Sequence, residues 1–196
     1  IDAETGEELG RFPTGVEPEG VDVSPDGRWA YITGEATHTV TVIDREALSV
    51  VTHVLVGNRP REVDFSTDGS VAYVSAEIGG TITVIDTSTH RVVNTINLGL
   101  DSRPVEMAVD PTRPRLYVAG GGTSAVYVID TDTNELVATV RERMGRRPRG
   151  VAVTPDGSRI FTANGLSDSV TVIDADTLEV IDELQARLGA HEKQTG

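Results

Sequence analysis

The residues with the clearest capacity for chemistry are arginines that stand beside a proline at regular intervals. The phrases GNRPREV, DSRPVEM and GRRPRGV follow one another along the chain, and a variant, VEPEGV, precedes them. Guanidinium groups donate planar, forked pairs of hydrogen bonds that suit carboxylates and other oxyanions. The residue before each proline is Glu17, Arg59, Arg103 or Arg147. The phrases therefore predict a repeated basic element on a chain whose formal net charge is -14.

Two interpretations of these arginines remain open. In the first, they pair with glutamates of neighbouring phrases and fasten one repeat to the next, as charged residues at turns most often do. In the second, they bind an anion, a carboxylate or an acidic partner surface, which the cluster of arginines between 141 and 149 favours. The candidate ligand- or partner-binding residues are Arg59, Arg61, Arg103, Arg147, Arg149, Glu62 and Glu106.

Aspartates are the next candidates for a site. Asp22 and Asp64 occupy one repeat position that Ala108 and Ala152 fill in later copies. We interpret them as structural aspartates with satisfied hydrogen bonds, the alternative being channel ligands or catalytic carboxylates. The segment from Asp130 begins like a calcium loop, but it lacks the glycine that such a loop requires at its sixth position. An aspartate followed three residues later by threonine predicts a side-chain-capped turn instead.

Other catalytic and metal-binding patterns are missing from the sequence. The four histidines fall in unrelated registers, and no nucleophile elbow or nucleotide-binding loop occurs. The absence of cysteine excludes disulfides, thiolate metal sites and haem attached through a Cys-x-x-Cys-His motif. We therefore expect no metal and no cofactor, and we assign no catalytic residue.

The composition of the chain limits the classes of protein to which it can belong. The chain has 196 residues, of which 38% are hydrophobic and 24% charged, and this is typical of a globular domain. No apolar run is long enough to predict a membrane span. The strongly negative charge argues against nucleic acid or an anionic membrane as partner. Because the first residue is not methionine, we expect a fragment of a longer protein.

Three features recur in the same register and define a repeat. The tripeptide Val-Ile-Asp, the proline of the arginine phrase and an aromatic residue each return after 42 or 44 residues. Each copy predicts four short strands rich in Val, Ile, Thr and Tyr, separated by turns such as Pro-Asp-Gly. The predicted units are 1–16 (outer strand of a preceding blade), 17–58, 59–102, 103–146 and 147–188 (complete blades), and 189–196 (a tail outside the repeat).

Four strands in each repeat of 42 or 44 residues predict an all-β fold, a β-propeller whose blades are four-stranded antiparallel sheets. The chain would hold about four complete blades of a larger ring. A β-solenoid is the alternative, but its coils are shorter and lack hairpin signals. In a propeller the first strand of a blade lines the axis and the fourth lies at the rim. Each arginine phrase should therefore cross one face of the ring and place its charges at the channel mouth.

The segments AYITG, AYVSA, LYVAG and FTAN, each followed by Val-Ile-Asp, resemble the YVTN β-propeller repeat. GVEPEGVDVSPDG, RPREVDFSTDG, AEIGGTITVID and ANGLSDSVTVID are most similar to the bacterial propellers associated with PQQ-dependent alcohol catabolism. The chain departs from that pattern where the family often has asparagine, with Gly34, Ala76 and Gly120 at the final motif position. The resemblance implies one closed propeller of about seven blades, exported to the periplasm or secreted.

The function expected from these observations is a non-enzymatic interaction or ligand-binding module. By resemblance it would contact a PQQ-dependent dehydrogenase or a cytochrome, or bind a small anion, at the arginine-lined mouth. One alternative is a propeller enzyme, either lactonase-like or a haem-binding enzyme like nitrite reductase. Another is a surface-layer or adhesion repeat protein.

Overall fold

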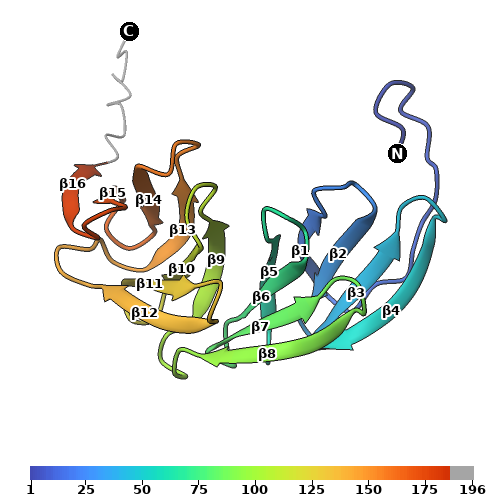
Figure 1. Ribbon diagram of the computed structural model, residues 1–196, viewed down its shortest axis with the longest axis horizontal. Coiled ribbons are helices and arrows are strands. Elements are labelled where there is room, and N and C mark those ends of the chain that lie inside the picture. Colours follow the sequence, from blue (N-terminus) through green and yellow to red (C-terminus); the bar gives the residue numbers. More distant parts are fainter. Residues whose placement is uncertain (186–196) are drawn as a thin grey trace, which may run out of the picture.

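Four antiparallel sheets of four strands each stand side by side in an arc (Figure 1). They come from a computed structural model that describes residues 1–185. Within each sheet the strands follow chain order, and the described residues contain no helix. This arrangement confirms the all-β propeller prediction, with each sheet as one blade.

Each blade is a four-strand meander of short strands. Blade 1 holds β1 (Pro18–Val23), β2 (Trp29–Gly34), β3 (Thr39–Asp44) and β4 (Ser49–Leu55). Blade 2 holds β5 (Pro60–Phe65), β6 (Val71–Ala76), β7 (Thr81–Asp86) and β8 (Arg91–Asn97). Blade 3 holds β9 (Pro104–Val109), β10 (Arg115–Gly120), β11 (Ala125–Asp130) and β12 (Glu135–Val140). Blade 4 holds β13 (Pro148–Val153), β14 (Arg159–Asn164), β15 (Ser169–Asp174) and β16 (Val180–Gln185).

The first strand of every blade lies on the concave side of the arc, and the fourth lies on its outer rim (Figure 1). Consecutive first strands contact one another, β1 with β5, β5 with β9, and β9 with β13. The chain must therefore cross from rim to axis between blades. The three crossing segments are residues 56–59, 98–103 and 141–147.

Turn chemistry explains why the meander forms locally. The carboxylate of Asp44, at the end of β3, accepts hydrogen bonds from the amides of Glu46 and Ala47 at 2.9 and 2.8 Å. The same aspartate-capped turn follows β7, β11 and β15. The turn at Asp130 is thus a capped hairpin, as predicted, because its carboxylate is occupied by amides of the turn itself. In all four turns one residue takes a left-handed backbone conformation: Leu48, His90, Asn134 and Leu178.

The hydrophobic core lies between blades rather than inside any one of them. Tyr31, Tyr73 and Tyr117 are at most 1% exposed, and each packs on the following blade. A buried aromatic ring removes roughly 150–250 Å² from water, so these contacts dominate cohesion between neighbours. Phe161 holds the same position in blade 4 but is only half-buried, since no further blade covers its face within residues 1–185.

The expected blade ranges 17–58, 59–102, 103–146 and 147–188 each contain one complete sheet. The structure assigns no strand to residues 1–16. Asp2 does cap a turn like those of the other blades, with its carboxylate accepting the amides of Glu4 and Thr5. An outer strand needs the other strands of its own blade for its backbone hydrogen bonds, and residues 1–185 hold no sheet before blade 1. The predicted tail, 189–196, lies outside the described residues.

Candidate functional site at the channel mouth

The three arginines that precede a proline share one backbone conformation. Arg59, Arg103 and Arg147 have positive φ angles of 61°, 46° and 56°, and Glu17 has 56°. This conformation is uncommon for residues other than glycine. Each carbonyl oxygen accepts the amide of the residue just after the second strand of its blade, at 2.9 to 3.1 Å. Those donors occupy one repeat position: Glu35, Glu77, Gly121 and Gly165.

The junction between blades 1 and 2, here called the first junction, consists of Glu19, Glu35, Arg59, Arg61 and Glu77. Arg61 contacts all three glutamates, with N–O distances of 2.7 Å to Glu19, 3.1 Å to Glu35 and 3.6 Å to Glu77. Arg59 pairs with Glu35 and lies 3.6 Å from Glu77. The side chains of Arg61 and Glu35 are only 13% and 14% exposed. Both arginines therefore follow the first interpretation and fasten one blade to the next.

Two carboxyl groups of the first junction, Glu19 and Glu35, have shifted pKa values. Burial, and then the hydrogen bond that Glu19 shares with Glu35, raise the pKa of Glu19 to about 6, against the lowering effect of the Arg61 charge. The same hydrogen bond lowers the pKa of Glu35, and the pairing with Arg59 adds to that effect. Glu35 is therefore the ionised carboxylate that faces both arginines at neutral pH.

The junction between blades 3 and 4, here called the third junction, has the same backbone and different side chains. Arg147 and Arg149 stand at the positions of Arg59 and Arg61. The three glutamates of the first junction are replaced, in order, by Val105, Gly121 and Gly165. Among residues 1–185, no ion pair includes Arg103, Arg147 or Arg149, and none of their guanidinium groups donates a hydrogen bond.

Of the two glycines at the replaced positions, Gly165 lies near Arg147 and Arg149, whereas Gly121 lies near the backbone of the two crossing phrases. A Cβ atom at Gly165 would lie 3.8 Å from the carbonyl oxygen of Arg147 and 4.0 Å from Cδ of Arg149. A Cβ atom at Gly121 would lie 3.3 Å from the carbonyl oxygen of Pro148. Arg149, Gly165 and Asp168 help to line a cavity of about 400 Å³. This cavity, which Ala163, Val170 and Leu184 also line, opens on the face of blade 4 that is turned away from blade 3. The third junction itself has no carboxylate at the three positions where the first junction has glutamates.

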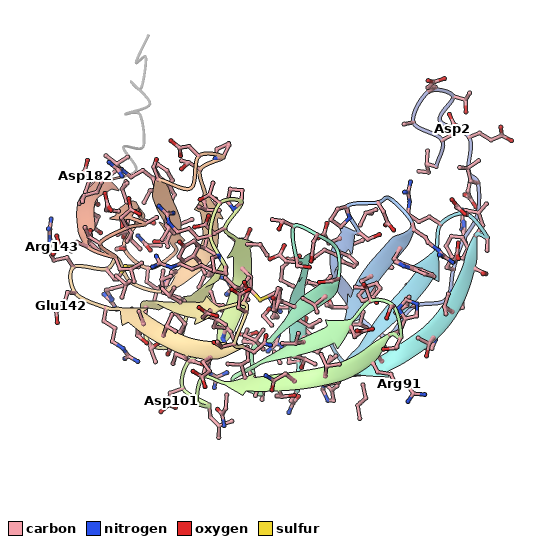
Figure 2. The ribbon with its side chains drawn as sticks, viewed as in Figure 1. Asp2, Arg91, Asp101, Glu142, Arg143 and Asp182 are labelled. Atoms are coloured by element: carbon pink, nitrogen blue, oxygen red, sulfur yellow. The ribbon has the colours of Figure 1, made fainter. Side chains whose placement is uncertain are left out.

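The arginines of residues 141–149, which are close together in the sequence, lie in different parts of the structure. Arg143 points away from the concave side of the arc (Figure 2) and donates a hydrogen bond to the carbonyl of Val180 at 2.8 Å. Arg141 lies over the ring of Tyr127, 6.0 Å from its centroid. Both therefore make contacts near the rim, whereas Arg147 and Arg149 lie at the third junction.

The two glutamates predicted at the mouth, Glu62 and Glu106, form no ion pair with the arginines among residues 1–185. They belong instead to an acidic inner wall with Asp22 and Asp64, which we call the acidic wall. Burial raises the pKa of Glu106, and burial together with the charges of Glu106 and Asp22 raises the pKa of Glu62. Neither glutamate therefore neutralises the arginine phrases.

Asp22 and Asp64 share a repeat position but differ in environment. The Asp22 carboxylate accepts amides from Val23 at 2.7 Å and from Phe65 of the next blade at 3.1 Å, as expected of a structural aspartate. In Asp64, atom Oδ2 is buried and has no hydrogen-bond partner within the described chain. Burial, and then the charges of Glu62, Asp22 and Glu106, raise its pKa to about 8. Asp64 is therefore protonated at neutral pH.

The residues that sequence reasoning missed are the partners Glu19, Glu35 and Glu77. Their signal was present, because positions 35, 77, 121 and 165 follow the 42- and 44-residue repeat and read Glu, Glu, Gly, Gly. Residues 1–185 bring together no group of three or more His, Cys, Asp or Glu side chains suited to a metal ion. The same part of the chain has no helix with the length and apolarity that a membrane span needs.

Comparisons with known proteins agree with this architecture. Residues 46–193 match the family model described as "Lactonase, 7-bladed beta-propeller". No curated protein matches the chain.

Solved structures share the fold at low identity. Hydrazine synthase from Kuenenia stuttgartiensis is 26% identical with a TM-score of 0.80, over 91% of this chain and 52% of its own. The dihydro-heme d1 dehydrogenase NirN, in complex with DHE, is 20% identical with a TM-score of 0.74, over 89% of this chain and 39% of its own. A functionally unknown protein from Desulfotomaculum acetoxidans DSM 771 is 18% identical with a TM-score of 0.78, over 95% of this chain and 62% of its own. The chain thus spans less than two thirds of each of these proteins.

Proposed function

The chain belongs to the lactonase family of seven-bladed β-propellers, and from this premise we propose that it is a non-enzymatic, ligand-binding propeller. Its ligand is a small anion, or an acidic group of a partner, held at the channel mouth. One observation carries the proposal. Arg103, Arg147 and Arg149 have no carboxylate partner among residues 1–185, although the whole chain carries a formal charge of -14.

Local charge supports binding of an anion in spite of the acidic body. Exposed charges act over roughly 8–10 Å at physiological salt, so the distant carboxylates are largely screened at the mouth. A guanidinium group within contact distance forms charge-assisted hydrogen bonds, each contributing roughly 1.5–3 kcal/mol. The expected affinity is therefore modest and sensitive to salt.

Lactone hydrolysis is a second candidate function, favoured by the family and by the acidic wall. Asp64 carries a proton at neutral pH, since its pKa is about 8, and Glu62 lies close enough to raise that value. Carboxyl groups whose pKa values are driven apart suit general acid and base roles. In such a reaction water adds to the lactone carbonyl, the ring C–O bond breaks, and the leaving oxygen takes a proton. The product is a hydroxy acid whose carboxylate suits the arginines.

The further expectations from the YVTN resemblance stay predictions. They are an association with PQQ-dependent alcohol oxidation, contact with a quinoprotein dehydrogenase or a cytochrome, and a periplasmic or secreted location. The proposed anion site is compatible with an acidic partner surface as well as with a small molecule.

Titration calorimetry tests the proposal, with gluconate, malate and phosphate as probes and glucose as the neutral control. We expect heat of binding for at least one anion, none for glucose, and a strong reduction of the heat in 0.5 M NaCl. Absence of binding by every anion would contradict the proposal. A pH-stat assay with gluconolactone separates the two candidates, because acid release that disappears in Asp64→Asn would favour hydrolysis.

A further inference from the structure

A cavity of about 410 Å³ lies between blades 2 and 3. Three turns surround it, residues 66–70 of blade 2 and residues 110–114 and 131–132 of blade 3. We propose that this cavity, here called the interblade pocket, binds a small guanidinium compound. The site is independent of the channel mouth, because each arginine phrase precedes the first strand of a blade, whereas the turns at 66–70 and 110–114 follow that strand.

The interface between blades 3 and 4 shows how guanidinium groups bind at the equivalent place. Arg113, in the turn after β9, pairs with the carboxylate of Asp176 in blade 4. Arg115, at the start of β10, donates a hydrogen bond to the carbonyl oxygen of Ala175 at 2.7 Å. Both acceptors belong to the turn after β15. Two arginines of one blade are thus held by the aspartate-capped turn of the next.

Blade 3 keeps both acceptor positions. One repeat of 44 residues earlier, Asp132 and Thr131 stand where blade 4 has Asp176 and Ala175. Both residues line the interblade pocket. Among residues 1–185, no ion pair includes Asp132 and its carboxylate accepts no hydrogen bond. The carboxylate is therefore free to pair with a ligand.

Blade 2 lacks the arginines that would meet these acceptors. Gly69 and Val71 stand where blade 3 has Arg113 and Arg115. Neither replacement has a side-chain donor, and Val71 lines the pocket. A planar, forked guanidinium group of a ligand can therefore occupy the space that arginine side chains occupy at the next interface.

The hydroxyl of Tyr73 supplies a further contact. Tyr73 is 1% exposed and lines the pocket. At the same repeat position, the hydroxyl of Tyr31 lies 2.7 Å from Nδ1 of His90, and that of Tyr117 donates to a carboxylate at 2.8 Å. The hydroxyl of Tyr73 shares a hydrogen bond with Thr131, another residue of the lining. Because a phenol oxygen both donates and accepts, it can also accept an N–H of the ligand.

The charges around the pocket favour a cation. Burial raises the pKa of Tyr73, the hydrogen bond with Thr131 lowers it, and the nearby charges of Asp68 and Asp132 raise it. Arg113 also lines the pocket, but its guanidinium group already donates to Asp110, Asp176 and the carbonyl of Gly157. Two carboxylates without an ion-pair partner in the described chain, Asp68 and Asp132, therefore remain for the ligand.

Titrations followed by the amide chemical shifts of isotope-labelled protein test the site. The probe is butylguanidine, and butylurea, which has nearly the same shape without the charge, is the control ligand. We expect butylguanidine to bind at least about tenfold more tightly than butylurea. Its binding should shift the amides of residues 66–73 and 131–133.

A pair of charge variants tests the role of Asp132. Asp132→Asn should weaken butylguanidine binding at least about tenfold, because it removes the carboxylate equivalent to Asp176. Asp101→Asn removes the same charge from an exposed position in the crossing segment 98–103 and should leave the affinity unchanged.

A second set of variants tests the space and the hydroxyl. Val71→Arg should abolish binding, because the chain then supplies its own guanidinium group as it does with Arg115. Tyr73→Phe removes only the hydroxyl from the pocket and should weaken binding several-fold. Tyr31→Phe, the matched change in blade 1, should not alter it.

Three results would overturn the proposal. The first is absence of butylguanidine binding, or binding that shifts no amide of the turns around the pocket. The second is equal affinity for butylurea. The third is an equal loss in Asp101→Asn and Asp132→Asn, because general attraction to an acidic chain would then explain the binding. Circular dichroism melting of each variant verifies that the propeller remains folded.

Discussion

The first and third junctions have one backbone and opposite charge balance. Both place an arginine in a left-handed conformation before a proline, and both hold it by a bond between its carbonyl and the amide after the second strand. At the first junction three glutamates surround the guanidinium groups, whereas at the third a valine and two glycines replace them. The comparison shows that the repeat preserves backbone positions, while the side chains decide whether a position forms ion pairs between blades.

Position alone is therefore a poor guide to function in this chain. The ring of arginines predicted at the mouth is one set of equivalent residues, yet Arg59 and Arg61 are already neutralised. The acidic wall shows the same kind of difference. Asp22 accepts hydrogen bonds from two backbone amides, whereas the equivalent Asp64 has a buried oxygen without a partner within the described chain. Substitutions that remove or add carboxylate partners test these differences between the junctions and between Asp22 and Asp64.

The largest effect is expected from Asp64 and depends on pH. Its folded pKa is about 8 against an ordinary value of 3.8, so the folded state holds a proton that the unfolded state releases above pH 4. The stability linked to this proton is full below pH 4, declines as the pH rises, and is lost above pH 8. Asp64→Asn should remove this decline and stabilise the protein at pH 8 by on the order of 5 kcal/mol. Equal pH slopes in variant and wild type would contradict the assigned environment.

An effect of intermediate size is expected from removing the carboxylates of the first junction. Glu35→Ala combined with Glu77→Ala leaves Arg61, which is 13% exposed, with Glu19 alone. Breaking buried ion pairs from one side is costly, so we expect the free energy of unfolding to fall by about 3 kcal/mol. Urea denaturation at pH 7 measures it, with the exposed Glu46→Ala as control. A loss below about 0.5 kcal/mol, within the usual scatter of surface substitutions, would show that the network adds no stability.

A smaller effect is expected from exchanging arginine for lysine at the two junctions. Arg149→Lys keeps the charge but loses the forked donor pair, so gluconate affinity should fall about tenfold, equivalent to roughly 1.4 kcal/mol. Arg59→Lys at the first junction should leave gluconate affinity unchanged, since Glu35 and Glu77 already occupy that side chain. Calorimetry measures both, and equal losses would remove the distinction between the junctions.

The smallest effect is expected from Gly165→Ala. The added methyl group would meet its nearest atoms at 3.8 and 4.0 Å, and Gly165 does not have a positive φ angle. The unfolding free energy should therefore change by less than about 0.5 kcal/mol in either direction. Thermal or urea denaturation measures it. A loss above about 1 kcal/mol would show that the chain itself fills this space.

Local patterns in the sequence were sufficient to predict most of the fold. Strand composition, the Pro-Asp-Gly turns and the aspartate-capped turns act over a few residues, and their recurrence every 42 or 44 residues predicts the blade. Residues 1–16 hold no strand in this structure, and the expectation that they are the outer strand of a preceding blade stays a prediction, because forming a strand depends on a neighbouring strand as well as on local preference. Glu62 and Glu106 form no ion pair with the arginines among residues 1–185, which the sequence pattern alone could not show.

The amino-acid sequence was enough to predict the repeat, the blades and the arginines at the crossings. Which arginines have partners depends on how the blades pack. Arg61 takes its carboxylates from its own blade and from the blade before it, through residues 16 to 42 positions away. Electrostatic pairing depends on distances of a few ångströms between side chains, and stacking of blades sets those distances. The same repeat position therefore has carboxylate partners at one junction and, among residues 1–185, none at another.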